Sequence, residues 1–150
     1  MILNEVLTRQ SLITKLSLTH GNKELSKELK VKIMRMRMAY NKIKQQFEID
    51  SKEFSSQIVS EELKNLINKA DKTEEELARF KELNDKANAE FQEFLMQKGN
   101  EEVKDFEDLT FSEDEFADIL DINSDGEYEV NSQKIQAPDF MEIIYALFVK

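Results

Sequence analysis

Carboxylates are the most common residues in this chain that could do chemistry, and one short run of them has the spacing of a calcium loop. Asp121, Asn123, Asp125 and Gly126 match positions one, three, five and six of an EF-hand loop, in which oxygen ligands surround Ca²⁺ and glycine permits a sharp bend. Position twelve is Ser132, where that loop needs a bidentate glutamate, and strand-like residues follow in place of a second helix. The sequence therefore favours an asparagine–glycine turn between a helix and a strand over a calcium site.

Other catalytic or metal-binding chemistry lacks the residues that it requires. The chain has no cysteine and one histidine, His20, so thiolate sites and clusters of histidines are excluded. Its three glycines are isolated at 21, 99 and 126, so no glycine-rich phosphate loop exists. Carboxylate pairs need burial to shift a pKa for acid–base work, and none lies in an apolar sequence context. We expect a protein that is not an enzyme and that has no cofactor.

The net charge of −10 conceals an asymmetry between the two ends of the chain. Residues 1–46 hold ten Lys and Arg against three acids, whereas residues 101–129 hold thirteen acids and one Lys. The basic segment could bind phosphates, but no nucleic-acid-binding motif accompanies it, and the sequence does not favour that function. The acidic segment could mimic DNA phosphates. The favoured interpretation is that the two surfaces attract each other, within one chain or between neighbours.

The elements that position these residues are mainly helices. The clearest pattern is an apolar row at steps of three and four, which predicts one helix of more than twenty residues. The row consists of Leu25, Leu29, Ile33, Met36, Tyr40, Ile43 and Phe47. A second apolar row, Val31, Met34 and Met38, lies on another face of this helix. A helix with two apolar rows is typical of the centre of a bundle, where the methionines pack in the core, or of an oligomer interface. If the row docks a partner helix, the cations beside it are Lys30, Arg35 and Arg37.

Local signals delimit the remaining elements. A first helix is expected over residues 3–18, with Gly21 as its stop. Capping boxes at Thr73 and Ser112 predict two further helices, the first of which ends at Gly99. Strand patterning at 127–130 and a pairing strand near Ile135 precede a last helix that begins near Pro138. The fold class is therefore mainly α, with a helical hairpin or bundle over 1–98 and a small acidic helix–strand–helix unit over 99–150 that packs on the first or reaches a neighbour.

The order of these elements resembles that of a family of small tailed-bacteriophage proteins of unassigned role. The resemblance covers nearly the whole chain and is carried by residues 24–33 (Glu-Leu-Ser-Lys-Glu-Leu-Lys-Val-Lys-Ile), residues 114–120 (Asp-Glu-Phe-Ala-Asp-Ile-Leu), the strand pair and the terminal apolar helix at 137–149. It implies a phage gene product and transfers no functional residues to this chain.

These observations lead us to expect a non-enzymatic structural or assembly protein that acts through protein–protein contacts, with further copies of itself among the partners considered. One alternative is an acidic inhibitor of a host enzyme that binds nucleic acid, and another is a calcium-dependent binding module. The N-terminus has no signal-peptide pattern, and no stretch is apolar enough to span a membrane. The expected location is the host cytoplasm or the virion.

Overall fold

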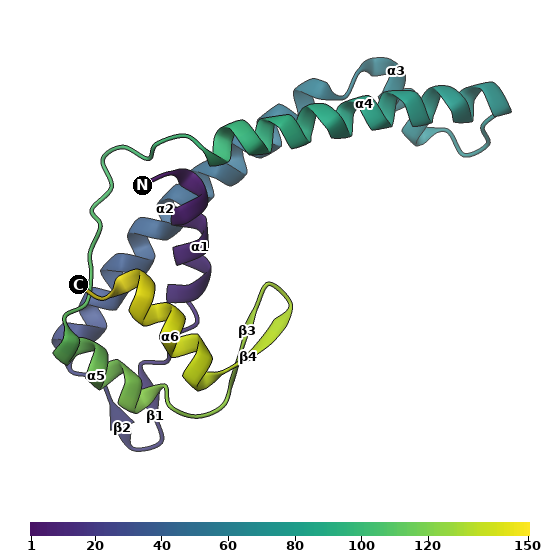
Figure 1. Cartoon of the computed structure of the whole chain (residues 1–150). Helices are drawn as coiled ribbons and strands as arrows, with labels where there is room; N and C mark the ends of the chain where they lie inside the picture. The colour runs from purple at the N-terminus through teal and green to yellow at the C-terminus, as the bar shows by residue number, and fades with distance from the viewer. The chain divides into compact units, whose positions relative to one another are not determined.

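The computed structural model describes residues 1–150 and confirms the mainly α class. It is 66% helical, with six helices and two small antiparallel strand pairs. The elements are α1 (Leu3–Ile13), β1 (Thr19–His20), β2 (Lys23–Glu24), α2 (Lys27–Ile58), α3 (Glu61–Asn68), α4 (Glu74–Gly99), α5 (Glu113–Ile122), β3 (Glu127–Val130), β4 (Gln133–Gln136) and α6 (Ala137–Phe148) (Figure 1). None of these helices combines the length and the apolar character that crossing a membrane requires.

The chain forms two compact units. The first unit contains Met1, Leu3–Lys44 and Val103–Lys150, and the second unit contains Ile2 and Gln45–Glu102. The chain does not divide where the sequence suggested, between residues 98 and 99, because the C-terminal segment packs against the N-terminal one. α2 supplies its first turns to the first unit and its last turns to the second.

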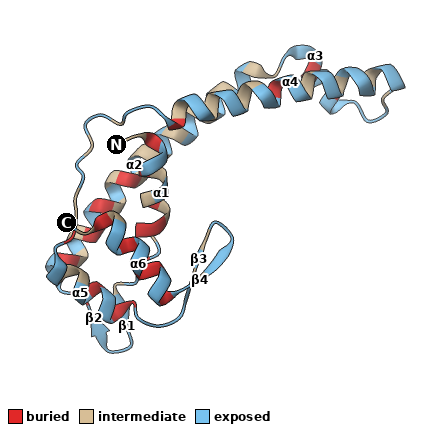
Figure 2. Cartoon of the chain, in the orientation of Figure 1, coloured by how far each residue is buried: buried red, intermediate tan, exposed pale blue.

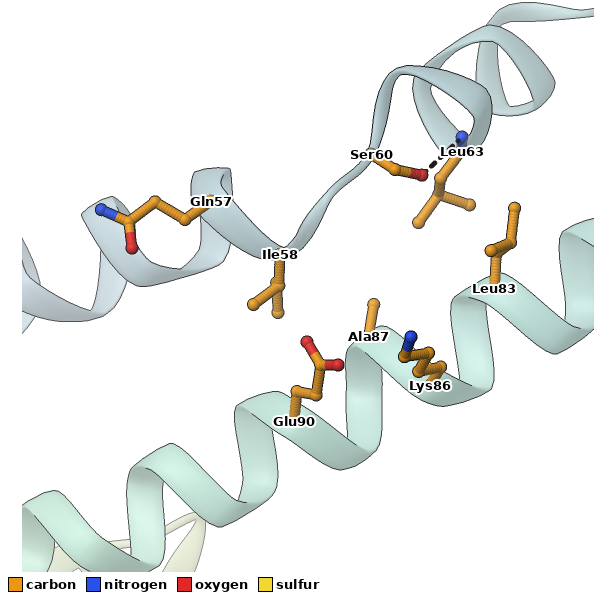
Figure 3. A pocket seen from close by; sticks show the side chains of 8 residues that line it. All are labelled: Gln57, Ile58, Ser60, Leu63, Leu83, Lys86, Ala87 and Glu90. Carbon is orange, nitrogen blue, oxygen red and sulfur yellow. Dashed lines mark hydrogen bonds between the residues drawn. The ribbon is translucent and has the colours of Figure 1, made fainter.

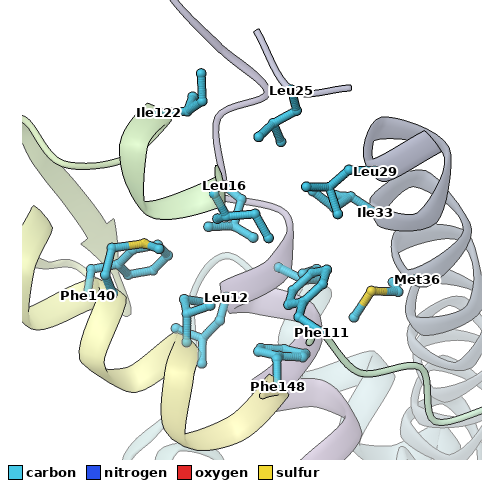
Figure 4. Close-up of a cluster of buried hydrophobic side chains, with 14 of the residues drawn as sticks. Leu12, Leu16, Leu25, Leu29, Ile33, Met36, Phe111, Ile122, Phe140 and Phe148 are labelled. Atoms are coloured by element: carbon cyan, nitrogen blue, oxygen red, sulfur yellow. The ribbon is translucent and has the colours of Figure 1, made fainter. Parts of the chain in front are cut away.

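The core of the first unit joins residues that are far apart in the sequence. Leu29, Ile33, Met36 and Tyr40 of the leading apolar row are buried on α2, whereas Ile43 and Phe47 are only partly buried. Figure 4 shows side chains of this row facing those of α1, α5 and α6. The largest buried members are Ile13, Ile33, Met36, Tyr40, Phe111, Ile119, Phe140, Met141, Ile144 and Phe148. Phe111, just before α5, is also bonded to the end of α6, since its N–H donates to the carbonyl of Phe148 at 2.7 Å. The hydrophobic stabilisation of this unit therefore depends on long-range contacts.

The first helix is shorter than the sequence suggested. α1 ends at Ile13, because the guanidinium of Arg37 donates to the carbonyl oxygens of Ile13 at 3.1 Å and Leu16 at 2.6 Å and so satisfies the end of the helix. Gly21 is not a helix stop. It lies in the two-residue turn between β1 and β2 at φ +60°, where a side chain would be strained.

Both predicted capping boxes are confirmed. The Thr73 hydroxyl accepts from the N–H of Glu76, whose carboxylate accepts from the N–H of Thr73, and α4 begins there and ends at Gly99 as expected. Ser112 and Glu115 open α5 in the same way. The predicted hairpin is also present as β3 and β4, followed by α6 with a proline in its first turn. These elements were readable because their signals are local.

The second unit is a helical hairpin in which the last turns of α2, together with α3, run beside α4. Phe54 of α2 stacks on Phe94 of α4 with 4.3 Å between ring centroids. Near the open end of the hairpin, the ammonium of Lys98 lies 3.3 Å from the carboxylate of Asp50. Figure 2 shows few buried residues along this hairpin.

Candidate protein interaction face on α2

Three large apolar side chains of α2 lie exposed on one face of the first unit. Val31 is 48% exposed, Met34 52% and Met38 68%. Their spacing of three and four residues places them on the same side of the helix, away from the buried row that includes Ile33 and Met36. The sequence singled out all three, but its interpretation of Met34 and Met38 as core residues is wrong, because no other element of the first unit covers them.

Cations lie at both ends of this apolar row. Lys27 precedes it by four residues and Lys42 follows it by four, so both share its face. Both lysines are exposed, and no ion pair or hydrogen bond holds either ammonium group. Arg35 flanks the row and lies 3.3 Å from Glu107, but each side chain of this pair is at least 60% exposed, so the interaction is weak. We call Lys27, Val31, Met34, Arg35, Met38 and Lys42 the α2 face.

Two of the cations predicted beside the row have other partners. Lys30 donates to the carboxylate of Glu24 at 2.8 Å, and this hydrogen bond lowers the pKa of Glu24. Arg37 is turned towards α1, where it donates to two carbonyls, and burial lowers the pKa of its guanidinium. The sequence could not separate these two from Arg35, because all three lie on the same basic helix.

Several basic residues of the N-terminal segment form ion pairs with the acidic segment within the first unit. Lys32 donates to Glu115 at 2.8 Å, and the ion pairs Arg9–Asp108 and Lys23–Asp121 join further basic residues to the acidic segment. Burial raises the pKa of Glu115, but the bonds from Lys32 and Ser112 outweigh burial, so the net shift is downward. These pairs hold the acidic segment against α1 and α2, and they leave Lys27 and Lys42 as the free cations of the α2 face.

The residues of the candidate calcium loop do not converge. Asn123 is fully buried, and its side-chain oxygen accepts from the N–H of Ser17 at 2.8 Å and from the hydroxyl of Tyr128 at 2.6 Å. Its amide nitrogen donates to the carbonyls of Ser17 and Ile119. Asp121 bonds to Lys23, and Asp125 lies 3.5 Å from the imidazole of His20. No group of three or more His, Cys, Asp or Glu residues is placed to hold a metal ion.

Asn123 is thus a structural residue whose role sequence reasoning missed. It links the loop after α1 to α5 and β3, and all its hydrogen-bonding capacity is used. The available signal was an asparagine directly after an apolar helix end, a common position for a capping side chain.

A pocket of about 240 Å³ lies in the second unit, where α2 breaks before α3. Ile58 and Leu63 point towards Leu83 and Ala87 of α4 across this opening, as Figure 3 shows. The break follows from Ser60, whose hydroxyl accepts from the N–H of Leu63 and opens α3. The rim carries Lys86 and Glu90, one of each charge, with Gln57, so the pocket offers apolar contact and no arrangement for catalysis.

No family model matches the chain, and no match was found among the curated proteins or the solved structures.

Proposed function

We propose that this chain is a non-enzymatic structural or assembly protein that acts through protein–protein contacts at the α2 face. The observation that carries the proposal is the exposed row of Val31, Met34 and Met38. Burying a side chain of this size contributes about 1.5–3 kcal/mol, so the row is a favourable place for a partner to bind. The resemblance to tailed-bacteriophage proteins supports assembly in a host cell or within a virion.

The partner that fits this face is an amphipathic helix with carboxylates beside its apolar side chains. Apolar residues spaced by three and four match the row, and the flexible methionines adapt to the shape of the partner. Lys27 and Lys42 are fifteen residues apart, which corresponds to about 22 Å along α2. Carboxylates at that separation would pair with both lysines and fix the register, because charge complementarity sets orientation and association rate more than affinity.

The acidic segment fits a phosphate mimic less well. A mimic must present free carboxylates to a basic enzyme, whereas Asp108 and Glu115 form partly buried ion pairs with Arg9 and Lys32 of the first unit. A calcium-dependent module would need the side chain of Asn123, which is buried and fully bonded.

The test is photocrosslinking in the cells that produce the protein. Benzoylphenylalanine replaces Met38 of the α2 face, and in a matched control it replaces Met96, which is 70% exposed on α4. We expect one discrete protein to crosslink at position 38 but not at position 96, and mass spectrometry to map the crosslink to an acidic amphipathic helix. Adding Met34→Glu should abolish the product, because it places a carboxylate against the carboxylates of the partner.

Two results would overturn the proposal. One is the same set of products from positions 38 and 96, which would mean that the α2 face has no specific partner. The other is a crosslink to nucleic acid at position 38, which would make the lysines a phosphate-binding surface.

A further inference from the structure

The second unit buries very few apolar side chains for its length. Leu63, Leu66 and Ala87 are the only buried ones in Gln45–Glu102, whereas all others belong to the first unit. Helices derive most of their stability in proteins from packing of an apolar face, and a two-helix layer covers that face along only one line. A stable hairpin of this kind therefore needs a further layer.

The side chains that such a layer would cover are half-buried along the seam of the hairpin. On α4 they recur at steps of three and four, which is the pattern of a helix in a bundle. They are Phe80, Leu83, Phe91 and Phe94, with Ala87 among them, and Phe54 and Ile58 face them from α2. The pocket opposite Ala87 opens in this seam.

The rim of the pocket indicates what covers it. Lys86 and Glu90 lie four residues apart on α4 with opposite charges, and neither makes an ion pair or hydrogen bond within the chain. If a second α4 crosses antiparallel with a two-fold axis near Asn88, each Lys86 faces the Glu90 of the other copy. A surface of a single charge would pair with one of them and repel the other. Self-complementarity of this kind is the property of an isologous interface.

We propose that the second unit pairs with the second unit of another copy of this chain in a four-helix arrangement that covers the seam and the pocket. This interface is distinct from the α2 face and does not depend on the function proposed for it. The second unit carries eight Lys and Arg against fifteen Asp and Glu. Salt screens the repulsion between two such units, so the dimer should become stronger as ionic strength rises. Binding of an acidic helix to the lysines of the α2 face should become weaker.

The experiment measures the mass of the full chain by light scattering after size exclusion, over a range of protein and salt concentrations. We expect twice the 17.6 kDa of one chain, with more dimer at high salt. Lys86→Glu and Glu90→Lys should each weaken dimerisation about tenfold, because each places like charges opposite one another. The double variant Lys86→Glu/Glu90→Lys should restore the dimer, since a two-fold interface with exchanged charges is again complementary. Lys81→Glu, at an exposed α4 lysine without an ion pair, makes the same change in net charge and is the matched control, which should weaken the dimer much less than Lys86→Glu does.

Several outcomes would overturn this inference and leave the function of the α2 face in place. A monomer at every concentration and salt would do so. A dimer that Met34→Glu dissociates and Lys86→Glu does not would assign self-association to the α2 face. Conversely, a dimer that behaves as expected, together with no specific crosslink at Met38, would support the inference and remove the proposed function.

Discussion

The two units use their apolar residues in different ways. In the first unit, helices from both ends of the chain close a core in which Ile13, Ile33 and Phe140 are fully buried. In the second unit, three half-buried phenylalanines stack in a row and no side chain of that size is fully buried. The first unit thus has the contacts of a self-sufficient fold, whereas the second has those of one layer of a larger assembly.

Polar interactions also differ between the units, since those of the first unit include buried hydrogen bonds and those of the second are mainly exposed ion pairs. The first unit buries Asn123 with all its hydrogen bonds made, so loss of any partner leaves a buried polar group unpaired. In the second unit, Arg79 binds both carboxylate oxygens of Glu62, at 2.7 and 3.1 Å, but both side chains are about half exposed. Exposed pairs contribute little to stability. Substitutions should therefore have larger effects in the first unit than in the second.

The largest expected difference comes from one leucine in each unit. Leu16 is 3% exposed in the first unit and Leu63 is 2% exposed in the second. Leu16→Ala should lower the free energy of unfolding of the first unit by about 3 kcal/mol, because it leaves a cavity in a closed core. Leu63→Ala should leave that transition unchanged and increase amide exchange in α3 and α4. Urea denaturation with hydrogen-exchange mass spectrometry measures both, and equal effects on one shared transition would show that the units unfold together.

The buried asparagine gives the next largest effect. Asn123→Ala should cost about 2 kcal/mol, because the N–H of Ser17 and the hydroxyl of Tyr128 lose their buried acceptor. The matched control is Asn65→Ala at an exposed position of α3, which should change stability by less than about 0.5 kcal/mol. A calcium titration of the wild type belongs in the same experiment. A large thermal stabilisation by Ca²⁺ would contradict a purely structural role for Asn123.

The sequence predicted those parts of the fold that depend on residues close together in the chain and missed those that depend on distant residues. The caps at Thr73 and Ser112 join residues three apart, so the sequence predicted both helix starts. The end of α1 is capped by Arg37, which lies 24 residues beyond Ile13. The sequence therefore predicted a first helix that extends too far, to residue 18. The bond between Asn123 and Ser17 spans 106 residues, and no local pattern contains it.

The candidate site divides in the same way. Helical periodicity placed Val31, Met34 and Met38 on one face, because that property depends only on spacing. Whether the face is covered depends on the rest of the fold. The fold also decides that Arg37 caps α1 while Arg35 stays exposed beside the row. The sequence also could not predict the open seam of the second unit, since Phe54 and Phe91 have the same apolar pattern whether they are buried or half-exposed.

A smaller difference is expected between the two capping boxes. Thr73→Ala in the second unit and Ser112→Ala in the first each remove one side-chain cap, for which the loss is about 1 kcal/mol. In the first unit this loss should appear in the global unfolding transition. In the second it should appear as fraying of the first turn of α4, detected as faster exchange of residues 74–77. A global shift of equal size from both variants would contradict the comparison.

The smallest expected effect is the pH dependence of the cap of α4 in the second unit. The hydrogen bond from Lys69, together with those from Thr73, lowers the pKa of Glu76 from 4.5 to about 2. A carboxylate whose pKa is lower in the folded state stabilises that state above its unfolded pKa and loses this contribution as pH falls. The cap of α4 should therefore weaken as pH falls from about 4.5 to 2.

An NMR titration of the Thr73 amide proton and the Glu76 carboxyl carbon measures this directly. Glu76→Gln keeps an acceptor for the N–H of Thr73 but cannot titrate, so the amide of Thr73 should lose its response in this range. The first unit is an internal reference, because the capping glutamate of α5, Glu115, also has a lowered pKa but is packed against Lys32. If α4 frayed with the same pH dependence in Glu76→Gln as in the wild type, its cap would not be the acid-sensitive group. The weakness of the second unit at low pH would then lie in the other exposed ion pairs, of which Arg79–Glu62 is the first to test.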